Sequence, residues 1–139
     1  MSVDSAHWLH VVAAVISRED AVLLAMRPQG KHQGGKWEFP GGKVEAGESA
    51  QRALVRELYE ELAIAVDPDC LESFLQVRHT YPDKAVFLDV WSVTAFSGEP
   101  QGCEGQQIGW FKSTQLQGMT FPDANLPILE KLARTLLKS

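Results

Sequence analysis

The stretch that most constrains this chain runs from Gly41 to Ile64, GGKVEAGESAQRALVRELYEELAI. It predicts a helix on which Glu57, Glu60 and Glu61 stand at positions i, i+3 and i+4 and therefore share one face. At a separation of about 6 Å and an effective dielectric near 20, each pair repels by roughly 3 kcal/mol before salt screening. A cation among the oxygens offsets this repulsion, and Mg²⁺ is usually held by a few carboxylates plus substrate phosphates. The three glutamates therefore predict a divalent-metal site.

The residues around these carboxylates predict how the helix begins and packs. Gly41 and Gly42 permit a turn with positive φ and the close approach of a ligand, and the Gly41 carbonyl could supply a further oxygen ligand. Glu48 and Ser49 stand where the helix begins. Arg56 follows Glu48 by two turns, so it is placed to fold back onto Glu48 as a bidentate pair. The apolar side that packs on a core consists of Ala53, Leu54, Leu58 and Leu62.

Length and composition limit the class of protein. The 139 residues suit one domain, residues 1–139, of which 1–8 are expected to be loosely ordered. Hydrophobic residues make up 45% and charged residues 22%, as in an ordinary soluble globule. The net charge of −5 argues against tight binding to a nucleic-acid polymer. It does not argue against a nucleotide, because a metal can carry the phosphate contacts.

The absence of targeting signals and the placement of the cysteines bear on the compartment in which the protein is expected. No apolar run is long enough to span a membrane, and no charged leader followed by an apolar segment opens the chain. Cys70 and Cys103 lack the spacing of metal ligands and are expected to be free thiols in a reducing compartment. We therefore expect a cytoplasmic protein with no membrane partner.

Hydrophobic patterning predicts the order of the elements. Strands are expected at 10–17, 21–26, 71–81, 85–96 and 108–112, and helices at about 49–62 and 126–138. The first two strands form a hairpin, whereas 27–36 and 97–107 are polar, glycine-containing loops. This order predicts an α/β fold with a mixed sheet.

The spacing of charged residues and glycines resembles a known motif. Gly42, five residues, Glu48, seven residues and then Arg56-Glu57-Leu58-Tyr59-Glu60-Glu61 is similar to the Nudix box of the Nudix hydrolases. The box ends here in Leu62-Ala63-Ile64, so Ala63 replaces the usual glycine and puts the turn after the helix in question. The resemblance implies an α/β/α sandwich around a mixed sheet. It also implies metal ligation by the Gly41 carbonyl, Glu57, Glu60 and Glu61, with Mg²⁺ as cofactor and Mn²⁺ as a substitute.

Three segments outside the box are most similar to the MutT-type members of this family, which hydrolyse nucleoside triphosphates. They are Trp37–Lys43 (WEFPGGK), Glu104-Gly105-Gln106, and Phe121–Asn125 (FPDAN). The implied reaction attacks the β-phosphorus and releases a nucleoside monophosphate and pyrophosphate. The implied role is sanitation of the nucleotide pool, which serves DNA repair.

The general base is left open between two residues. A metal-bound carboxylate, with Glu57 foremost, is one candidate and Glu104 is the other. By composition Glu104 is a solvated loop residue, whereas the matching family position is an additional metal ligand or a base. Arg56 matches a family residue of the active site but reads more as a structural clamp than as a catalyst.

Substrate contacts are expected at four residues. The Asn125 amide offers an acceptor beside donors, which suits a purine carrying O6 and a protonated N7, as in 8-oxoguanine. The alternative is that Asn125 caps the last helix. Arg27 is placed to contact base or phosphate, and Lys43 to approach phosphate; solvated surface roles are the alternatives. Tyr81 either stacks on the base or belongs to the core.

These inferences lead to one enzyme and two alternatives. The enzyme is a metal-dependent pyrophosphohydrolase of (oxidised) nucleoside triphosphates such as 8-oxo-dGTP, acting as a monomer or homodimer. The first alternative is the same chemistry on CTP or another pyrimidine triphosphate, a dinucleoside polyphosphate or ADP-ribose. The second is a non-catalytic nucleotide-binding module, against which the presence of Glu57, Glu60 and Glu61 argues.

Overall fold

The computed structural model describes residues 8–27 and 35–137. In this part of the chain the strands are β1 (Trp8–Arg18), β2 (Ala21–Met26), β3 (Trp37–Glu38), β4 (Gly41–Lys43), β5 (Glu72–Tyr81), β6 (Lys84–Val93) and β7 (Ile108–Lys112). The helices are α1 (Ala50–Leu62), α2 (Ser113–Leu116) and α3 (Leu126–Leu137), with the 3₁₀ turns η1 (Pro68–Cys70) and η2 (Asp123–Asn125).

β1 is the central strand of a mixed sheet. It runs parallel to β6 along one edge, with Val12 opposite Asp89, and antiparallel to β2 and β4 along the other. β5 extends the sheet beyond β6, and β2 carries β3 and β7. The β-branched run of β1 suits this position because it is buried on both faces.

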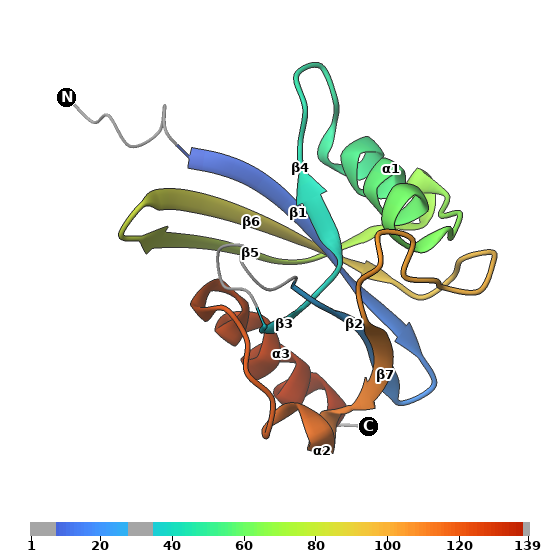
Figure 1. Cartoon of the computed structure of the whole chain (residues 1–139), viewed down its shortest axis with the longest axis vertical. Coiled ribbons are helices and arrows are strands. Elements are labelled where there is room, and N and C mark those ends of the chain that lie inside the picture. Colours follow the sequence, from blue (N-terminus) through green and yellow to red (C-terminus); the bar gives the residue numbers. More distant parts are fainter. Residues whose placement is uncertain (1–7, 28–34, 138–139) are drawn as a thin grey trace.

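Alternate residues of β1 divide the core into two layers. Ala13 and Val15 pack in the same layer as Ile128 and Leu132 of α3. On the other face, Val12, Ala14 and Ile16 pack with Leu54, Leu58 and Leu62 of α1. The two helices therefore cover opposite faces of the sheet (Figure 1). The α/β/α sandwich around a mixed sheet is confirmed.

The ends of α1 follow from local chemistry. The Ser49 hydroxyl accepts a hydrogen bond from the Arg52 N–H at 3.1 Å and so caps the first turn. At the other end Ala63 takes a left-handed φ of 60° and donates its N–H to the Tyr59 carbonyl. Ala63 thus makes the same kind of turn that a glycine makes, at a steric cost of about 1–2 kcal/mol.

The residues before α1 do not form the glycine turn expected from the sequence. Gly41 and Gly42 lie in strand β4, and neither has a positive φ. They are required for close packing instead, because a Cβ on Gly41 would lie 1.9 Å from the Val12 carbonyl oxygen. A Cβ on Gly42 would lie 2.4 Å from the Glu57 carboxyl carbon. The groups that approach these glycines closely are therefore the Val12 backbone and the Glu57 carboxylate of the protein itself.

Other differences from the sequence-based prediction are small. Trp8 belongs to β1, although it was expected among the loosely ordered residues. The segment between β7 and α3 contains α2 and η2, which are too short to show a periodic pattern. Most of the predicted loop 27–36 lies outside the described residues, as do residues 1–7 and 138–139. None of the helices that the structure describes is long and apolar enough to cross a membrane.

Candidate active site

The candidate site lies where two strands diverge from the same edge of β1. β4 pairs with β1 at Val11–Ala13, whereas β2 pairs with it only at Ser17 and Arg18. The gap between β2 and β4 holds a pocket of about 210 Å³. It is lined by Ala25, Met26, Arg27, Glu38, Gly41, Glu61, Glu104 and Gln106. The divergence therefore brings together Gly41, Glu61 and Glu104, three residues to which the family resemblance assigns metal or base roles.

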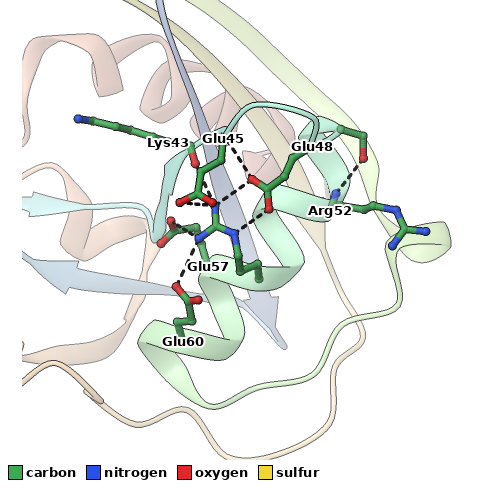
Figure 2. A network of polar contacts seen from close by, with 8 residues as sticks. Lys43, Glu45, Glu48, Arg52, Glu57 and Glu60 are labelled. Carbon is green, nitrogen blue, oxygen red and sulfur yellow. Dashed lines mark hydrogen bonds and ion pairs between the residues drawn. The ribbon is translucent and has the colours of Figure 1, made fainter.

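Arg56 is the centre of a network of polar contacts with Lys43, Glu48, Glu57 and Glu60 (Figure 2). Its Nε and Nη2 donate to the two carboxylate oxygens of Glu48 at 2.7 and 3.0 Å, so the predicted bidentate pair is present. Its Nη1 donates to Glu57 at 2.9 Å and to Glu60 at 3.3 Å. Nη2 also reaches the Lys43 carbonyl oxygen at 3.1 Å. One guanidinium thus ties β4, the following loop and two turns of α1 together.

The charge of Arg56 sets the ionisation of its partners. Its hydrogen bonds to Glu48 lower the pKa of that carboxyl to about 2, although Glu48 lies near the surface. In return, chiefly through the Glu48 hydrogen bond, the pKa of Arg56 rises above its ordinary value. The Glu45 carboxylate lies 4.0 Å from Nη2 of Arg56, and we refer to Arg56 with Glu45, Glu48 and Glu60 as the clamped cluster.

A second group of carboxylates has the opposite character. Burial raises the pKa of Glu61 well above its ordinary range, and a hydrogen bond with Glu57 and the charges of Glu57, Glu104 and Glu38 raise it further. Burial likewise raises the pKa of Glu38, although Arg27 donates to that carboxylate at 2.7 Å and opposes the shift. We refer to Glu38, Glu61 and Glu104 as the open cluster; Glu57 lies between the two.

The loop before β7 holds Glu104 next to Glu61. The Cys103 N–H donates to the Glu61 carbonyl at 3.0 Å, and the Gln106 side-chain amide donates to the same oxygen at 3.1 Å. The side-chain Oε1 of Gln106 accepts from the Glu104 N–H at 2.9 Å. Carbonyls at the end of a helix lack intrahelical partners, so α1 offers a natural docking point for this loop.

A smaller pocket of about 110 Å³ adjoins the first, because Arg27 and Glu38 line both. Tyr81 and Asn125 lie in its wall, beside apolar residues of β1 and β6. Asn125 is 8% exposed. Its backbone N–H bonds to the Pro122 carbonyl, and its side-chain amide makes no hydrogen bond to any residue that the structure describes. The amide is therefore available to a ligand in this pocket.

Not every predicted residue reaches these pockets. The side chain of Lys43 is exposed on β4 and lines neither pocket. Glu60 is also exposed, forms an ion pair with Arg56 and lines neither pocket. A larger hollow of about 560 Å³ lies at the β1–β2 turn, but none of the clamped or open carboxylates lines it. We therefore place the candidate site at the two adjoining pockets, where carboxylates and a free amide converge.

Two site residues escaped the sequence-based reasoning. Glu38 was read as part of a short apolar segment, and only the pairing of β3 with β2 places it between the pockets. Gln106 was noted as part of a family-like segment, but its hydrogen bond to the Glu61 carbonyl joins residues 45 apart in sequence. A charged residue between Trp37 and Phe39 was the one local signal available for Glu38.

The donor set suits a hard divalent cation, although no preformed ligand cage is present. Among residues 8–27 and 35–137, no three acidic, histidine or cysteine side chains converge as a ready-made metal site. The open cluster nevertheless gathers carboxylates, and burial together with the neighbouring carboxylates raises the pKa of Glu61. Oxygen ligands crowded in this way fit the preference of Mg²⁺ and Ca²⁺, and not that of softer metals.

A NUDIX domain model matches residues 11–131 of the chain. The chain therefore belongs to the NUDIX domain family, and its Nudix hydrolase fold is the one expected from the sequence. Hydrolases of this family depend on divalent metals.

Relatives within the family narrow the class of enzyme. The chain is 37% identical to the 8-oxo-dGTP diphosphatase of Escherichia coli K12 over 127 residues, which cover 91% of this chain and 97% of that protein. It is 38% identical to the CTP pyrophosphohydrolase of the same organism over 122 residues, 88% of this chain and 89% of that protein. A solved structure from work on MutT of Aliivibrio salmonicida and Vibrio cholerae superposes with a TM-score of 0.78 at 41% identity, covering 91% of this chain and 98% of that chain. The expectation of a pyrophosphohydrolase is thereby confirmed.

Proposed function

We propose that the chain hydrolyses 8-oxo-dGTP and related oxidised nucleoside triphosphates to a nucleoside monophosphate and pyrophosphate. The observation that carries the proposal is the shared wall of the two pockets. Arg27 and Glu38 line both the pocket that holds Asn125 and the pocket that holds Gly41, Glu61 and Glu104. A base in the first pocket would therefore place its phosphates beside the carboxylates of the second.

The Asn125 amide supports the choice of base. Its oxygen can accept from the protonated N7 of 8-oxoguanine while its nitrogen donates to O6. Ordinary guanine presents acceptors at both positions, so one of the two hydrogen bonds would be lost. A buried polar group that is left unpaired costs about 1–3 kcal/mol. We infer from this cost that Asn125 favours the oxidised base.

The carboxylates are assigned to the metal and the attacking water. We assign Glu57, Glu60, Glu61 and the Gly41 carbonyl to hold Mg²⁺, or Mn²⁺ in its place. When bound, such an ion neutralises charge on the phosphates and lowers the pKa of a water. Glu104, fixed by Gln106 next to Glu61, is placed to hold a proton or to act as a further ligand. Arg56 positions Glu57, and Arg27 is placed to contact the substrate.

The direct test is release of the nucleoside monophosphate from 8-oxo-dGTP, dGTP, CTP and ADP-ribose with Mg²⁺, measured side by side, because hydrolysis of ADP-ribose gives AMP and ribose 5-phosphate without pyrophosphate. We expect kcat/KM to be highest for 8-oxo-dGTP. Highest turnover of CTP would instead favour the second candidate, a CTP pyrophosphohydrolase, which the 38% identity to such an enzyme supports. Turnover of ADP-ribose alone would refute the base assignment, and silence on all four substrates would refute the enzymatic proposal.

Two matched pairs of variants separate the site from the scaffold. Glu57→Gln should abolish most turnover, whereas Glu72→Gln on the exposed face of β5 should not. Asn125→Ala should lower the preference for 8-oxo-dGTP over dGTP, whereas Gln117→Ala, an exposed amide, should leave it unchanged. An Asn125→Ala variant that keeps its substrate ranking would remove the base-reading role.

A further inference from the structure

Tyr81 makes a contact that neither base stacking nor simple packing explains. It is the last residue of β5 and is 8% exposed. Its hydroxyl oxygen accepts a hydrogen bond from the Ala124 N–H at 3.0 Å, although the two residues are 43 apart in sequence. The contact is buried and joins the end of β5 to the turn η2.

The turn held by this contact carries Asn125. Ala124 is the residue before Asn125, and both are buried. The 3₁₀ hydrogen bond from the Asn125 N–H to the Pro122 carbonyl fixes the turn internally. The Tyr81 hydroxyl fixes the same turn to the sheet. Tyr81, Ala124 and Asn125 all line the smaller pocket, so the contact lies next to the residue assigned to read the base.

A phenylalanine at position 81 would keep the ring but lose the acceptor. The Ala124 N–H would then be buried without a partner, and such groups cost about 1–3 kcal/mol. The turn can relieve that cost by moving outward to water, which would carry Asn125 away from its place. A recognition group has to be held within about 0.5 Å of its productive position, so a small movement is enough to weaken discrimination.

We propose that the Tyr81 hydroxyl is a positioning group for base discrimination, acting through η2 on the Asn125 amide. The proposal rests on the proposed function, because it concerns the same purine-reading pocket. It assigns Tyr81 no contact with the reacting phosphates. Loss of the hydroxyl should therefore change the choice between purines much more than the turnover of a bound substrate.

The test is the ratio of kcat/KM for 8-oxo-dGTP to that for dGTP in Tyr81→Phe. We expect this ratio to fall by roughly 10- to 100-fold, the scale of loss that a misplacement of about 1 Å produces. The fall should come from a higher KM for 8-oxo-dGTP, with kcat little changed. Tyr59→Phe is the matched control, since Tyr59 is 66% exposed and should keep the wild-type ratio.

A double-mutant cycle distinguishes positioning from packing. If Tyr81 acts through Asn125, Tyr81→Phe should leave the ratio unchanged in an Asn125→Ala background. A further fall of the same size in that background would overturn the proposal, as would an unchanged ratio in the single variant. Hydrogen exchange at the Ala124 amide, read by NMR, should become faster in Tyr81→Phe; unchanged protection would also overturn it.

These outcomes separate the proposal from the function on which it rests. A wild-type protein without preference for 8-oxo-dGTP refutes both. A wild-type preference that Asn125→Ala removes and Tyr81→Phe retains refutes the role of Tyr81 alone.

Discussion

The clamped and open clusters both consist of glutamate carboxyl groups, but the pKa of Glu48 in the first is lowered and the pKa of Glu61 in the second is raised. In the clamped cluster Arg56 donates to Glu48 through two nitrogens and holds the pKa of that carboxyl at about 2. In the open cluster burial and neighbouring carboxylates hold the pKa of Glu61 well above its ordinary range. Fewer than two helical turns separate Arg56 from Glu61, since Glu61 follows Arg56 by five residues.

The difference shows how stability and function are divided along α1. The clamped cluster satisfies its charges with a guanidinium and fixes β4 and its loop to the helix. The open cluster retains a repulsion that an external cation would relieve. A folded chain that keeps such a repulsion gives up stability in the absence of metal, which is common at functional sites.

The largest expected effect comes from Glu61→Gln. We expect kcat to fall by about 10²- to 10³-fold, because a bound metal supplies several kcal/mol of charge stabilisation and each 1.36 kcal/mol is tenfold in rate. In chelator-treated protein the same change should raise Tm. A raised carboxyl pKa makes the native state bind more protons than the unfolded state, so stability is lost as pH rises above about 4.5.

The expected gain in Tm can be checked by measuring thermal unfolding of the metal-free proteins as a function of pH. The Tm advantage of Glu61→Gln over wild type should be absent below about pH 4.5 and should grow toward neutral pH. Glu72→Gln serves as the control with the same charge change on an exposed strand position. A lower Tm for Glu61→Gln than for wild type at neutral pH would contradict the claim that the Glu61 carboxylate destabilises the metal-free fold.

A smaller loss of activity is expected when the loop that carries Glu104 loses the hydrogen bonds of the Gln106 side chain. Gln106→Ala removes the two side-chain hydrogen bonds through which Gln106 links the Glu104 N–H to the end of α1, and leaves the Cys103 backbone hydrogen bond to Glu61 in place. Supporting partners of metal sites are worth about 10- to 100-fold in activity or metal affinity, so steady-state kcat and its Mg²⁺ dependence should change on that scale. Gln107→Ala alters the adjacent exposed side chain and should leave both unchanged. Equal effects of the two changes would remove the positioning role of Gln106.

The clamped cluster should show the opposite pH dependence. The pKa of Glu48 is about 2 in the folded protein against an ordinary value of 4.5, so its contribution to stability is complete above about pH 4.5. That contribution should disappear as pH falls toward 2. Glu48→Gln should therefore lower Tm at neutral pH, and the difference from wild type should close on acidification. A difference that is the same at both ends of this range would show that the charge of Glu48 does not stabilise the fold.

The smallest effect is expected at the end of α1. Ala63 has a φ of 60°, which costs an alanine about 1–2 kcal/mol and a glycine almost nothing. Part of this gain is offset by the greater freedom of glycine in the unfolded chain. Ala63→Gly should therefore raise the free energy of unfolding by about 0.5–1 kcal/mol in urea denaturation. Destabilisation would mean that the methyl group packs more favourably than its backbone strain costs.

The features that depend on local spacing were predictable. Carboxylates at i, i+3 and i+4 share a helical face whatever the rest of the chain does, and the distance from Glu48 to Arg56 suffices for their pairing. The helix and strand order followed from periodicity for the same reason. The metal, base and phosphate roles assigned to individual residues remain predictions.

The features that depend on strand register were not predictable. Gly41 and Gly42 looked like a turn, because sequence alone does not show that β4 pairs with Val11–Ala13. Glu38 becomes the shared wall of two pockets only through the pairing of β3 with β2. The Tyr81 hydroxyl and the Gln106 amide act through contacts spanning 43 and 45 residues. Such contacts leave no periodic signal along the chain.

The claim that Glu61 binds the metal and Glu48 serves the fold is tested most directly by the effect of Mg²⁺ on Tm in wild type, Glu61→Gln and Glu48→Gln. A ligand that binds only the native state at 100 times its Kd stabilises it by about 2.7 kcal/mol. We expect saturating MgCl₂ to raise Tm of wild type and Glu48→Gln by similar amounts and to leave Glu61→Gln almost unchanged. An equal rise in Glu61→Gln would contradict the assignment of Glu61 as a metal ligand.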